Sequence, residues 1–117
     1  MNSSQTGKQG EEIAEKYLVN LGYKILQNNF HSRFGEIDII AKDEDSIVFV
    51  EVKARSNDSF GKPLEAIGSK KLFGLIKTGQ LYLLKNKWSS FPYRFDAIEV
   101  ILSSEKTEIN HIKNITL

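Results

Sequence analysis

The feature that most constrains the fold is a pair of β-strand patterns joined by a short polar link. Residues 36–41 (Glu-Ile-Asp-Ile-Ile-Ala) and 46–54 (Ser-Ile-Val-Phe-Val-Glu-Val-Lys-Ala) are rich in β-branched and apolar side chains, and only Lys-Asp-Glu-Asp separates them. Short runs of this composition bounded by polar turn residues are typical of a β-hairpin. The two strands are therefore expected to be neighbours in one sheet.

The rest of the chain predicts two helices and further strands around this hairpin. A first helix is expected from about residue 8 to residue 21, before Gly22, because apolar side chains recur there at helical spacing: Ile13, Ala14, Tyr17, Leu18 and Leu21. Other patterns predict a strand over 23–30, a loop over 56–63, a helix over 65–85 that contains three glycines, a strand over 94–102 and a last strand over 108–117. The core order α-β-β-β-α-β predicts an α/β fold, with a central mixed sheet flanked by helices.

Composition excludes several classes of protein and site. The 117 residues have the length of one domain, and 40% hydrophobic with 26% charged residues is ordinary for a globular chain. The absence of cysteine excludes disulfides, thiolate catalysis and cysteine-based zinc sites, and two histidines are too few for a histidine-rich metal cage. The apolar runs are too short to span a bilayer and the first residues lack a signal-peptide pattern, so we expect a cytoplasmic protein with no membrane partner.

The net charge of +1 conceals two opposed segments. Residues 31–60 carry four basic and seven acidic side chains, a net −3, whereas residues 61–90 carry six Lys and one Glu, a net +5. On the second predicted helix, Lys70, Lys77 and Lys85 fall within about 80° of one another, and Lys71 lies about 100° from Lys70. This arrangement is either a solvated helix face or a basic stripe that binds the nucleic-acid backbone.

Charged side chains interrupt the two apolar strands of the hairpin. Alternation places Glu51 and Lys53 on one face, about 7 Å apart, together with Ile47 and Phe49. The hairpin lets Asp38 approach Glu51 from the neighbouring strand. One to three clustered carboxylates suit Mg²⁺ or Mn²⁺, which would activate a water near the lysine. The alternative is a structural Glu51–Lys53 ion pair at a strand end.

Other residues have a functional and a structural interpretation. Glu11 lies at the edge of the apolar stripe of the first helix, where it reaches inward or interacts with the helix dipole. Arg55 continues the face of Lys53, as a phosphate contact or a solvated strand end. Arg94 and Asp96 share a strand face and are expected to brace each other. Trp88, Phe91 and Tyr93 form a hydrophobic plug or stack unpaired bases. His31 is expected to be a surface residue rather than a ligand, and no role is assigned to His111.

The order and spacing of these residues resemble the YraN family of small bacterial proteins, which is assigned to the PD-(D/E)xK nuclease superfamily. The resemblance covers a core of about residues 7–101, leaves 102–117 as an extension, and rests on the following segments: Gly7-x-x-Gly10-Glu11-x-x-Ala14-x-x-Tyr17-Leu18, Asn29, Phe34-Gly35-Glu36-Ile37-Asp38, Phe49-Val50-Glu51-Val52-Lys53 with Arg55, Phe60-Gly61-x-Pro63-x-Glu65-Ala66, Lys71, Tyr82-Leu83 and Arg94-Phe95-Asp96. The chain departs from the usual family pattern at His31, where Arg is common, and at Gly68, where Thr is common.

The resemblance implies a restriction-endonuclease-like three-layer core and specific roles for matching residues. Asp38 and Glu51 would be paired ligands of Mg²⁺ or Mn²⁺, with Glu11 as a helix-borne acid, the carbonyl of Val52 as a further ligand and Lys53 as the catalytic lysine. The implied activity is hydrolysis of nucleic-acid phosphodiesters by metal-activated water. DNA is favoured over RNA. A similarity to archaeal Holliday-junction resolvases points to branched DNA and to a homodimer. The alternative is a non-catalytic nucleic-acid-binding or adaptor protein on a nuclease scaffold.

Overall fold

A five-stranded sheet organises the part of the protein that the computed structural model describes, residues 3–56 and 68–116. The elements follow the order α-β-β-β-α-β-β, and their bounds are α1 Ser3–Asn20, β1 Lys24–Ser32, β2 Gly35–Asp43, β3 Ser46–Ser56, α2 Ser69–Lys85, β4 Tyr93–Leu102 and β5 Thr107–Ile112. The predicted α/β fold with a mixed sheet is confirmed. β5 adds a fifth strand to the predicted core order and ends at Ile112, five residues before the predicted end.

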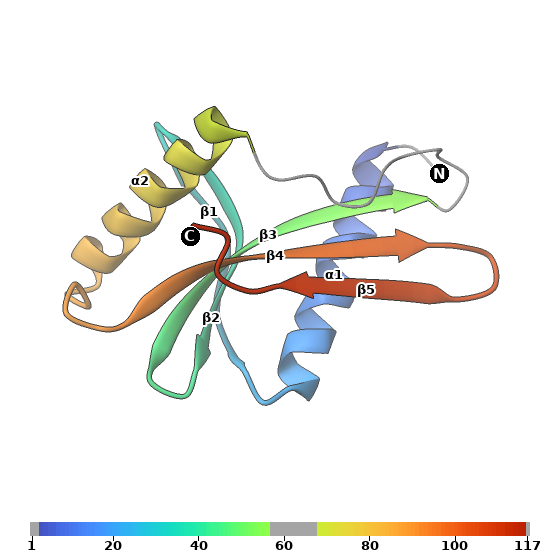
Figure 1. Cartoon of the computed structure of the whole chain (residues 1–117), viewed down its shortest axis with the longest axis horizontal. Coiled ribbons are helices and arrows are strands. Elements are labelled where there is room, and N and C mark those ends of the chain that lie inside the picture. Colours follow the sequence, from blue (N-terminus) through green and yellow to red (C-terminus); the bar gives the residue numbers. More distant parts are fainter. Residues whose placement is uncertain (1–2, 57–67, 117) are drawn as a thin grey trace.

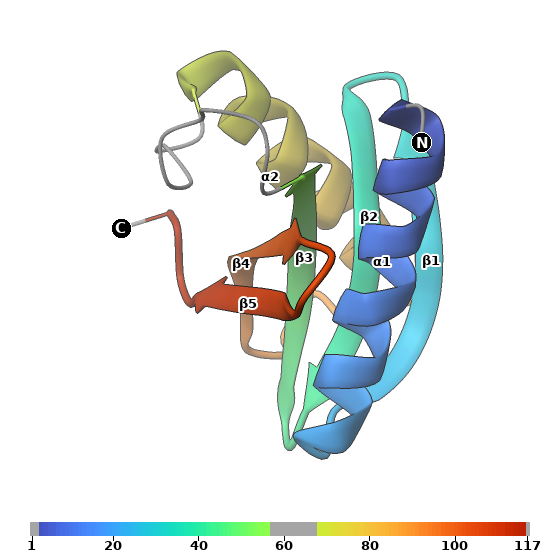
Figure 2. The ribbon, with the colours of Figure 1, turned by 90° about the vertical axis from the view of Figure 1, so that its right-hand side faces the viewer.

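The strands lie in the sheet in the order in which they occur in the chain, β1-β2-β3-β4-β5. All neighbours are antiparallel except β3 and β4, which pair in parallel. A parallel pair needs a crossover connection, and α2 lies within it. Figures 1 and 2 show α1 and α2 on opposite faces of the sheet, which gives three layers.

The alternation predicted for β3 is confirmed by two separate cores. Val48 and Val50 are buried against Ala14 and Leu18 of α1. Ile47 and Phe49 face the other way and belong to the core beneath α2, with Leu75, Tyr82 and Phe95. Glu51 and Lys53 continue the α2 face of β3, so the polar residues of this strand lie beyond the core that α2 covers.

The glycines of α2 are points of close contact with the sheet. A Cβ at Gly74 would lie 2.5 Å from the carbonyl oxygen of Phe34, and a Cβ at Gly79 would lie 2.7 Å from the ring of Phe95. A hydrogen bond of 2.7 Å between the hydroxyls of Ser32 and Thr78 adds a polar contact. Because close packing offsets the low helix propensity of glycine, α2 rests firmly on the β1–β2 hairpin.

Several predicted boundaries are wrong. α1 begins at Ser3 rather than residue 8, and Leu21 lies beyond its end, 53% exposed. Gly22 adopts φ 97° and ends the helix, so Tyr23 rather than Leu21 enters the core. α2 begins at Ser69, and the predicted loop and helix start within residues 57–67 lie outside the described residues. Neither described helix is long and apolar enough to cross a membrane.

Candidate functional site

The sheet opens between β2 and β3, and this opening positions the predicted site. Pairing of β2 with β3 ends at Ile39 and Val50, whereas β1 and β2 stay paired to Gly35, and β3 and β4 stay paired to Ser56. Figure 1 shows β3 turning away from β2 alongside β4. We call this opening the fork. Because β2 and β3 do not pair with each other along the fork, side chains can bond to backbone groups on its inner edges.

Asp38 supplies such a partner and lies inside the fork. Its Oδ2 accepts a hydrogen bond of 2.8 Å from the backbone N–H of Val52. The side chain also lies close enough to Glu51 for the two carboxyls to interact. The predicted approach of Asp38 to Glu51 across the hairpin is therefore confirmed.

The neighbouring Glu51 strongly affects the ionisation of Asp38. Burial, the hydrogen bond with Glu51 and the negative charge of Glu51 together raise the pKa of Asp38 from 3.8 to about 8. The Glu51 side chain is only 6% exposed. Two acids this close cannot both ionise at low cost, so the pair holds a proton near neutral pH unless a cation takes its place.

Lys71 of α2 reaches into the fork. Its Nζ lies 2.7 Å from Oε2 of Glu51, while 52% of the lysine side chain is exposed. This buried oxygen accepts no hydrogen bond of good geometry among the described residues, so the contact is an ion pair without an aligned hydrogen bond. The sequence predicts Lys71 as a nucleic-acid contact, and in the structure its ammonium lies on a carboxylate of the site.

Glu11 lies at the edge of the same cluster and is held by Asn29. With its amide nitrogen turned toward the acids, Asn29 donates hydrogen bonds to Oε1 of Glu11 (3.1 Å) and to Oε1 of Glu36 (2.9 Å). Burial and the charges of Glu36 and Glu51 raise the pKa of Glu11, which the hydrogen bond from Asn29 partly offsets. Asn29 adopts φ 53°, a left-handed conformation that asparagine tolerates. The carboxylate cluster therefore consists of Glu11, Glu36, Asp38 and Glu51.

The cluster is open rather than closed around one point. In the two described stretches of the chain, no three His, Asp or Glu side chains converge closely enough to form a metal site by themselves. Asp38 and Glu51 form the close pair, and Glu11 contributes charge from the side. Mg²⁺ commonly binds through one or two carboxylates and keeps several waters, so this donor set is compatible with it.

Lys53 and Arg55 differ in their surroundings although they share a strand face. Lys53 is exposed and makes no ion pair with any residue of the described segments, so the alternative Glu51–Lys53 pair does not form. Arg55 donates from Nε to Oε2 of Glu99 at 3.0 Å. The Glu99 side chain is 4% exposed and lies on β4 beside Lys53. Arg55 is thus anchored by a buried acid that the sequence did not indicate.

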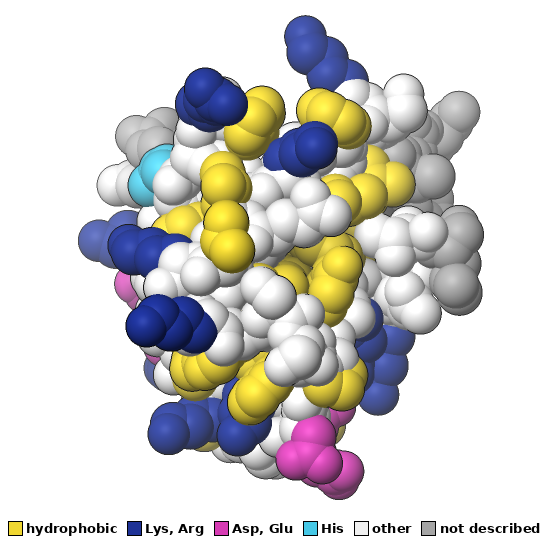
Figure 3. Space-filling model, turned by 90° about the vertical axis from the view of Figure 1, so that its left-hand side faces the viewer, with side chains coloured by type: hydrophobic (Ala, Val, Ile, Leu, Met, Phe, Trp, Pro, Cys, Tyr) yellow, Lys and Arg dark blue, Asp and Glu magenta, His cyan; other side chains and the backbone are white. Residues whose placement is uncertain are grey.

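The outer face of α2 is basic and partly apolar. Lys70 and Lys85 are exposed, and Lys77 lies with Nζ 5.5 Å from the centre of the Phe73 ring. Phe73 and Leu84 are 56% and 68% exposed. Figure 3 shows this side of the molecule, where dark blue Lys and Arg side chains surround exposed hydrophobic ones. The predicted grouping of Lys70, Lys77 and Lys85 on one helix is consistent with this surface.

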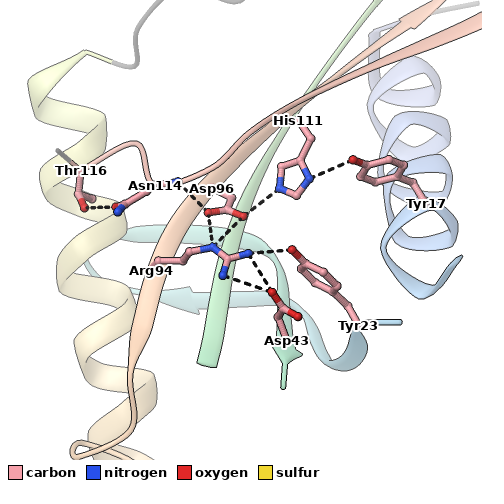
Figure 4. Close-up of polar contacts among 8 residues, drawn as sticks. All are labelled: Tyr17, Tyr23, Asp43, Arg94, Asp96, His111, Asn114 and Thr116. Atoms are coloured by element: carbon pink, nitrogen blue, oxygen red, sulfur yellow. Dashed lines mark hydrogen bonds and ion pairs between the residues drawn. The ribbon is translucent and has the colours of Figure 1, made fainter. Parts of the chain in front are cut away.

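A second polar network lies on the α1 face of β4 and is structural (Figure 4). Asp96 is fully buried, and its carboxylate accepts hydrogen bonds from Nε of Arg94 and from the backbone N–H of Asn114, both at 3.0 Å. Nε2 of His111 lies 2.9 Å from Oδ2. Burial alone would raise the pKa of Asp96, but these partners hold it below its ordinary value. The predicted bracing of Arg94 and Asp96 is confirmed.

The same network connects distant parts of the chain. Arg94 donates to the hydroxyl of Tyr23 at 2.7 Å and contacts Oδ2 of Asp43 at 3.4 Å. The hydroxyl of Tyr17 lies 3.1 Å from Nδ1 of His111. The sequence does not indicate this role of His111, because a single histidine in a weak strand pattern carries no local signal.

The remaining aromatic and histidine predictions concern the surface. Trp88 and Phe91 stack with centroids 5.9 Å apart, and Trp88 packs against the α2 core, which favours the hydrophobic plug. The His31 side chain is 69% exposed, with Nε2 3.6 Å from Glu36. His31 is thus a surface residue next to the carboxylate cluster.

Comparisons with known proteins identify the family. Residues 10–100 match the model of the uncharacterised protein family UPF0102. A UPF0102 protein of Clostridioides difficile is 48% identical over 97% of this chain and 98% of its own length. A UPF0102 protein of Persephonella marina is 49% identical over 92% of this chain and 90% of its own length. The chain therefore belongs to the uncharacterised protein family UPF0102.

Proposed function

We propose that this protein is a divalent-metal-dependent nuclease that hydrolyses phosphodiester bonds in DNA. The Asp38–Glu51 pair in the fork is the main support: Asp38 accepts a hydrogen bond from the N–H of Val52 across the fork, and burial together with the neighbouring Glu51 raises the pKa of Asp38 to about 8. Two adjacent acids carry more negative charge than the single ammonium of Lys71 balances, so the pair favours binding of a further cation. Its place on diverging strands, with Lys53 beside it, agrees with the resemblance to PD-(D/E)xK nucleases.

The side chains of the fork fit Mg²⁺ or Mn²⁺. Asp38 and Glu51 would supply carboxylate oxygens, and the carbonyl of Val52 would be a further ligand. Oε2 of Glu51 is buried without an aligned donor, so it has capacity for a cation. Glu11, steadied by Asn29, would add negative charge to the site from α1. Oxygen donors of this kind prefer hard cations.

The basic residues would handle the substrate. A bound divalent ion would supply an activated water and stabilise charge on the phosphoryl oxygen. Lys53 is exposed on the same strand face as Glu51, where its ammonium would position that water and neutralise developing charge. Lys70, Lys77 and Lys85 would bind the phosphate backbone along α2. Arg55 would contribute charge from its position on Glu99.

The finer features of the substrate follow from the family resemblance. The similarity to archaeal Holliday-junction resolvases favours branched or otherwise structured DNA over RNA. It favours a homodimer as well, since paired cuts need two sites. We expect the protein to act in the cytoplasm.

The test is cleavage of a panel of labelled substrates by purified protein with Mg²⁺ or Mn²⁺. The panel contains single-stranded, duplex, flapped and four-way DNA and a single-stranded RNA. Glu51→Ala and Lys53→Ala are expected to lower the cleavage rate by at least about a hundredfold, the scale on which removing one electrostatic stabiliser acts. Glu12→Ala and Lys16→Ala change exposed residues of α1 and are the matched controls.

The outcomes separate the two candidate functions. Cleavage that survives both site substitutions would show that the assigned residues are wrong. Binding of DNA without cleavage, with either metal, would support the alternative of a nucleic-acid-binding or adaptor protein. Loss of cleavage in the α1 controls as well would point to unfolding rather than to chemistry.

A further inference from the structure

We infer that the ammonium of Lys71 neutralises Glu51 in the metal-free fork. A divalent ion that binds Glu51 displaces this ammonium, which is then free to contact the substrate. This inference rests on the proposed function. The ammonium of Lys71 lies 2.7 Å from Oε2 of Glu51, an oxygen that is otherwise without an aligned donor among the described residues. The ammonium therefore contacts the same carboxylate oxygen that would bind a metal ion.

The charges around the fork explain why a cation is needed there. Four acids gather in the carboxylate cluster, and the charge of Glu51 raises the pKa of both Asp38 and Glu11. Of the neighbouring basic residues that the structure describes, Lys53 is exposed on the strand and Arg55 is bonded to Glu99. Lys71 thus forms the ion pair that balances Glu51. A buried carboxylate without its partner is costly, so this pair stabilises the metal-free fork.

A divalent ion and Lys71 cannot bind Glu51 together at low cost. Both are positive, and each needs the same buried oxygen, so repulsion at short distance opposes joint occupancy. Half of the Lys71 side chain is exposed and its stem has rotatable bonds, so the ammonium can swing out without movement of α2. Metal binding therefore exchanges one cation for another in the fork.

The released ammonium has a role at the basic face of α2. Lys71 lies in the first turn of the helix, next to Lys70 and less than two turns before Lys77. A phosphate group at the fork would give the free ammonium a new partner. Metal and nucleic acid should then bind with positive cooperativity, because each favours the state in which Lys71 has left Glu51. Lys71 would be a positioning residue that orders the two binding steps.

The experiment measures Mn²⁺ and Ca²⁺ affinity by calorimetry in wild type, Lys71→Met and the neighbouring control Lys70→Met. Methionine keeps an unbranched, flexible side chain one atom shorter than lysine and removes the charge. We expect Lys71→Met to bind Mn²⁺ about tenfold more tightly than wild type, since the competitor is gone, and Lys70→Met to match wild type. Adding short oligothymidylate with Ca²⁺ should tighten Ca²⁺ binding in wild type and do so less in Lys71→Met.

A second readout does not depend on activity. Without metal, Lys71→Met should have a lower melting temperature than wild type. Mn²⁺ should raise the melting temperature of Lys71→Met by more than it raises that of wild type. Lys71→Arg keeps the ion pair and should bind Mn²⁺ no more tightly than wild type. Tighter Mn²⁺ binding by Lys71→Arg would overturn the inference. A folded Lys71→Met protein that binds Mn²⁺ no more tightly than wild type would overturn it as well. Absence of metal binding in every variant would refute the proposed metal site, and this inference with it.

Discussion

Replacing Asp38 by asparagine should stabilise the protein while removing the proposed metal ligand. The amide oxygen can still accept the hydrogen bond from the N–H of Val52, so the shape of the fork is kept. What changes is the charge next to Glu51. The substitution therefore separates the electrostatic cost of the carboxylate pair from its structural role.

The magnitude follows from the raised pKa of Asp38, which is about 8 rather than 3.8. Between these values the folded protein holds a proton that the unfolded chain releases, so the free energy of unfolding falls as pH rises through this window. At about 1.4 kcal/mol per pH unit, the full window would cost about 5–6 kcal/mol. Asp38 is only half-buried and Lys71 offsets part of the charge, so we expect about 1–3 kcal/mol at pH 8.

The assay is urea denaturation in EDTA at pH 5, 6.5 and 8, followed by the fluorescence of Trp88, the single tryptophan. The free energy of unfolding of Asp38→Asn should exceed that of wild type at pH 8, and this difference should become smaller toward pH 5. Asp45→Asn, in the exposed turn between β2 and β3, should stay within about 0.5 kcal/mol of wild type at each pH. An Asp38→Asn protein that is less stable than wild type at pH 8 would refute the reasoning.

Three further substitutions test other parts of the structure. Gly74→Ala should lower the free energy of unfolding by about 1–3 kcal/mol in urea denaturation, because its Cβ would clash with the Phe34 carbonyl. Gly7→Ala, with open space around it, should not lose stability. Asp96→Ala should lower the free energy of unfolding by about 3–5 kcal/mol in the same measurement, since it leaves Arg94 without its buried partner. In wild type, the stability that Asp96 contributes should be lost as pH falls through the lowered pKa of this acid. Lys85→Gln should weaken DNA binding in anisotropy titrations and reduce the salt slope by about 1; an unchanged slope would exclude Lys85 from the interface.

Local patterns predicted the hairpin and its close acid pair well. The strands over 36–41 and 46–54 lie within β2 and β3, because alternation and the polar turn act over a few residues. The same alternation placed Glu51 and Lys53 on the α2 face. Helix ends were predicted less well: the first turns of α1 are polar and show no apolar periodicity, so its start at Ser3 has no hydrophobic signal.

The partners of the site residues could not be predicted, because they come from distant elements. Lys71 reaches Glu51 from α2, a separate element that packs closely against the sheet at Gly74 and Gly79. Asn29 reaches Glu11 from an irregular point of β1 with left-handed φ. Glu99 becomes the buried partner of Arg55 through the parallel register of β3 and β4. Contacts between elements set these pairs, and no spacing along the chain encodes them.

The network around Asp96 has a consequence for the order in which the chain folds during synthesis. Its carboxylate depends on His111 and on the N–H of Asn114, which follow it by 15 and 18 residues. At about 5–20 residues per second, about one to four seconds pass between the synthesis of Asp96 and that of Asn114. During this interval Arg94 is the ion-pair partner of Asp96. Burying a carboxylate so poorly satisfied is costly. We therefore expect α1 to dock on the sheet only after β5 has left the ribosome.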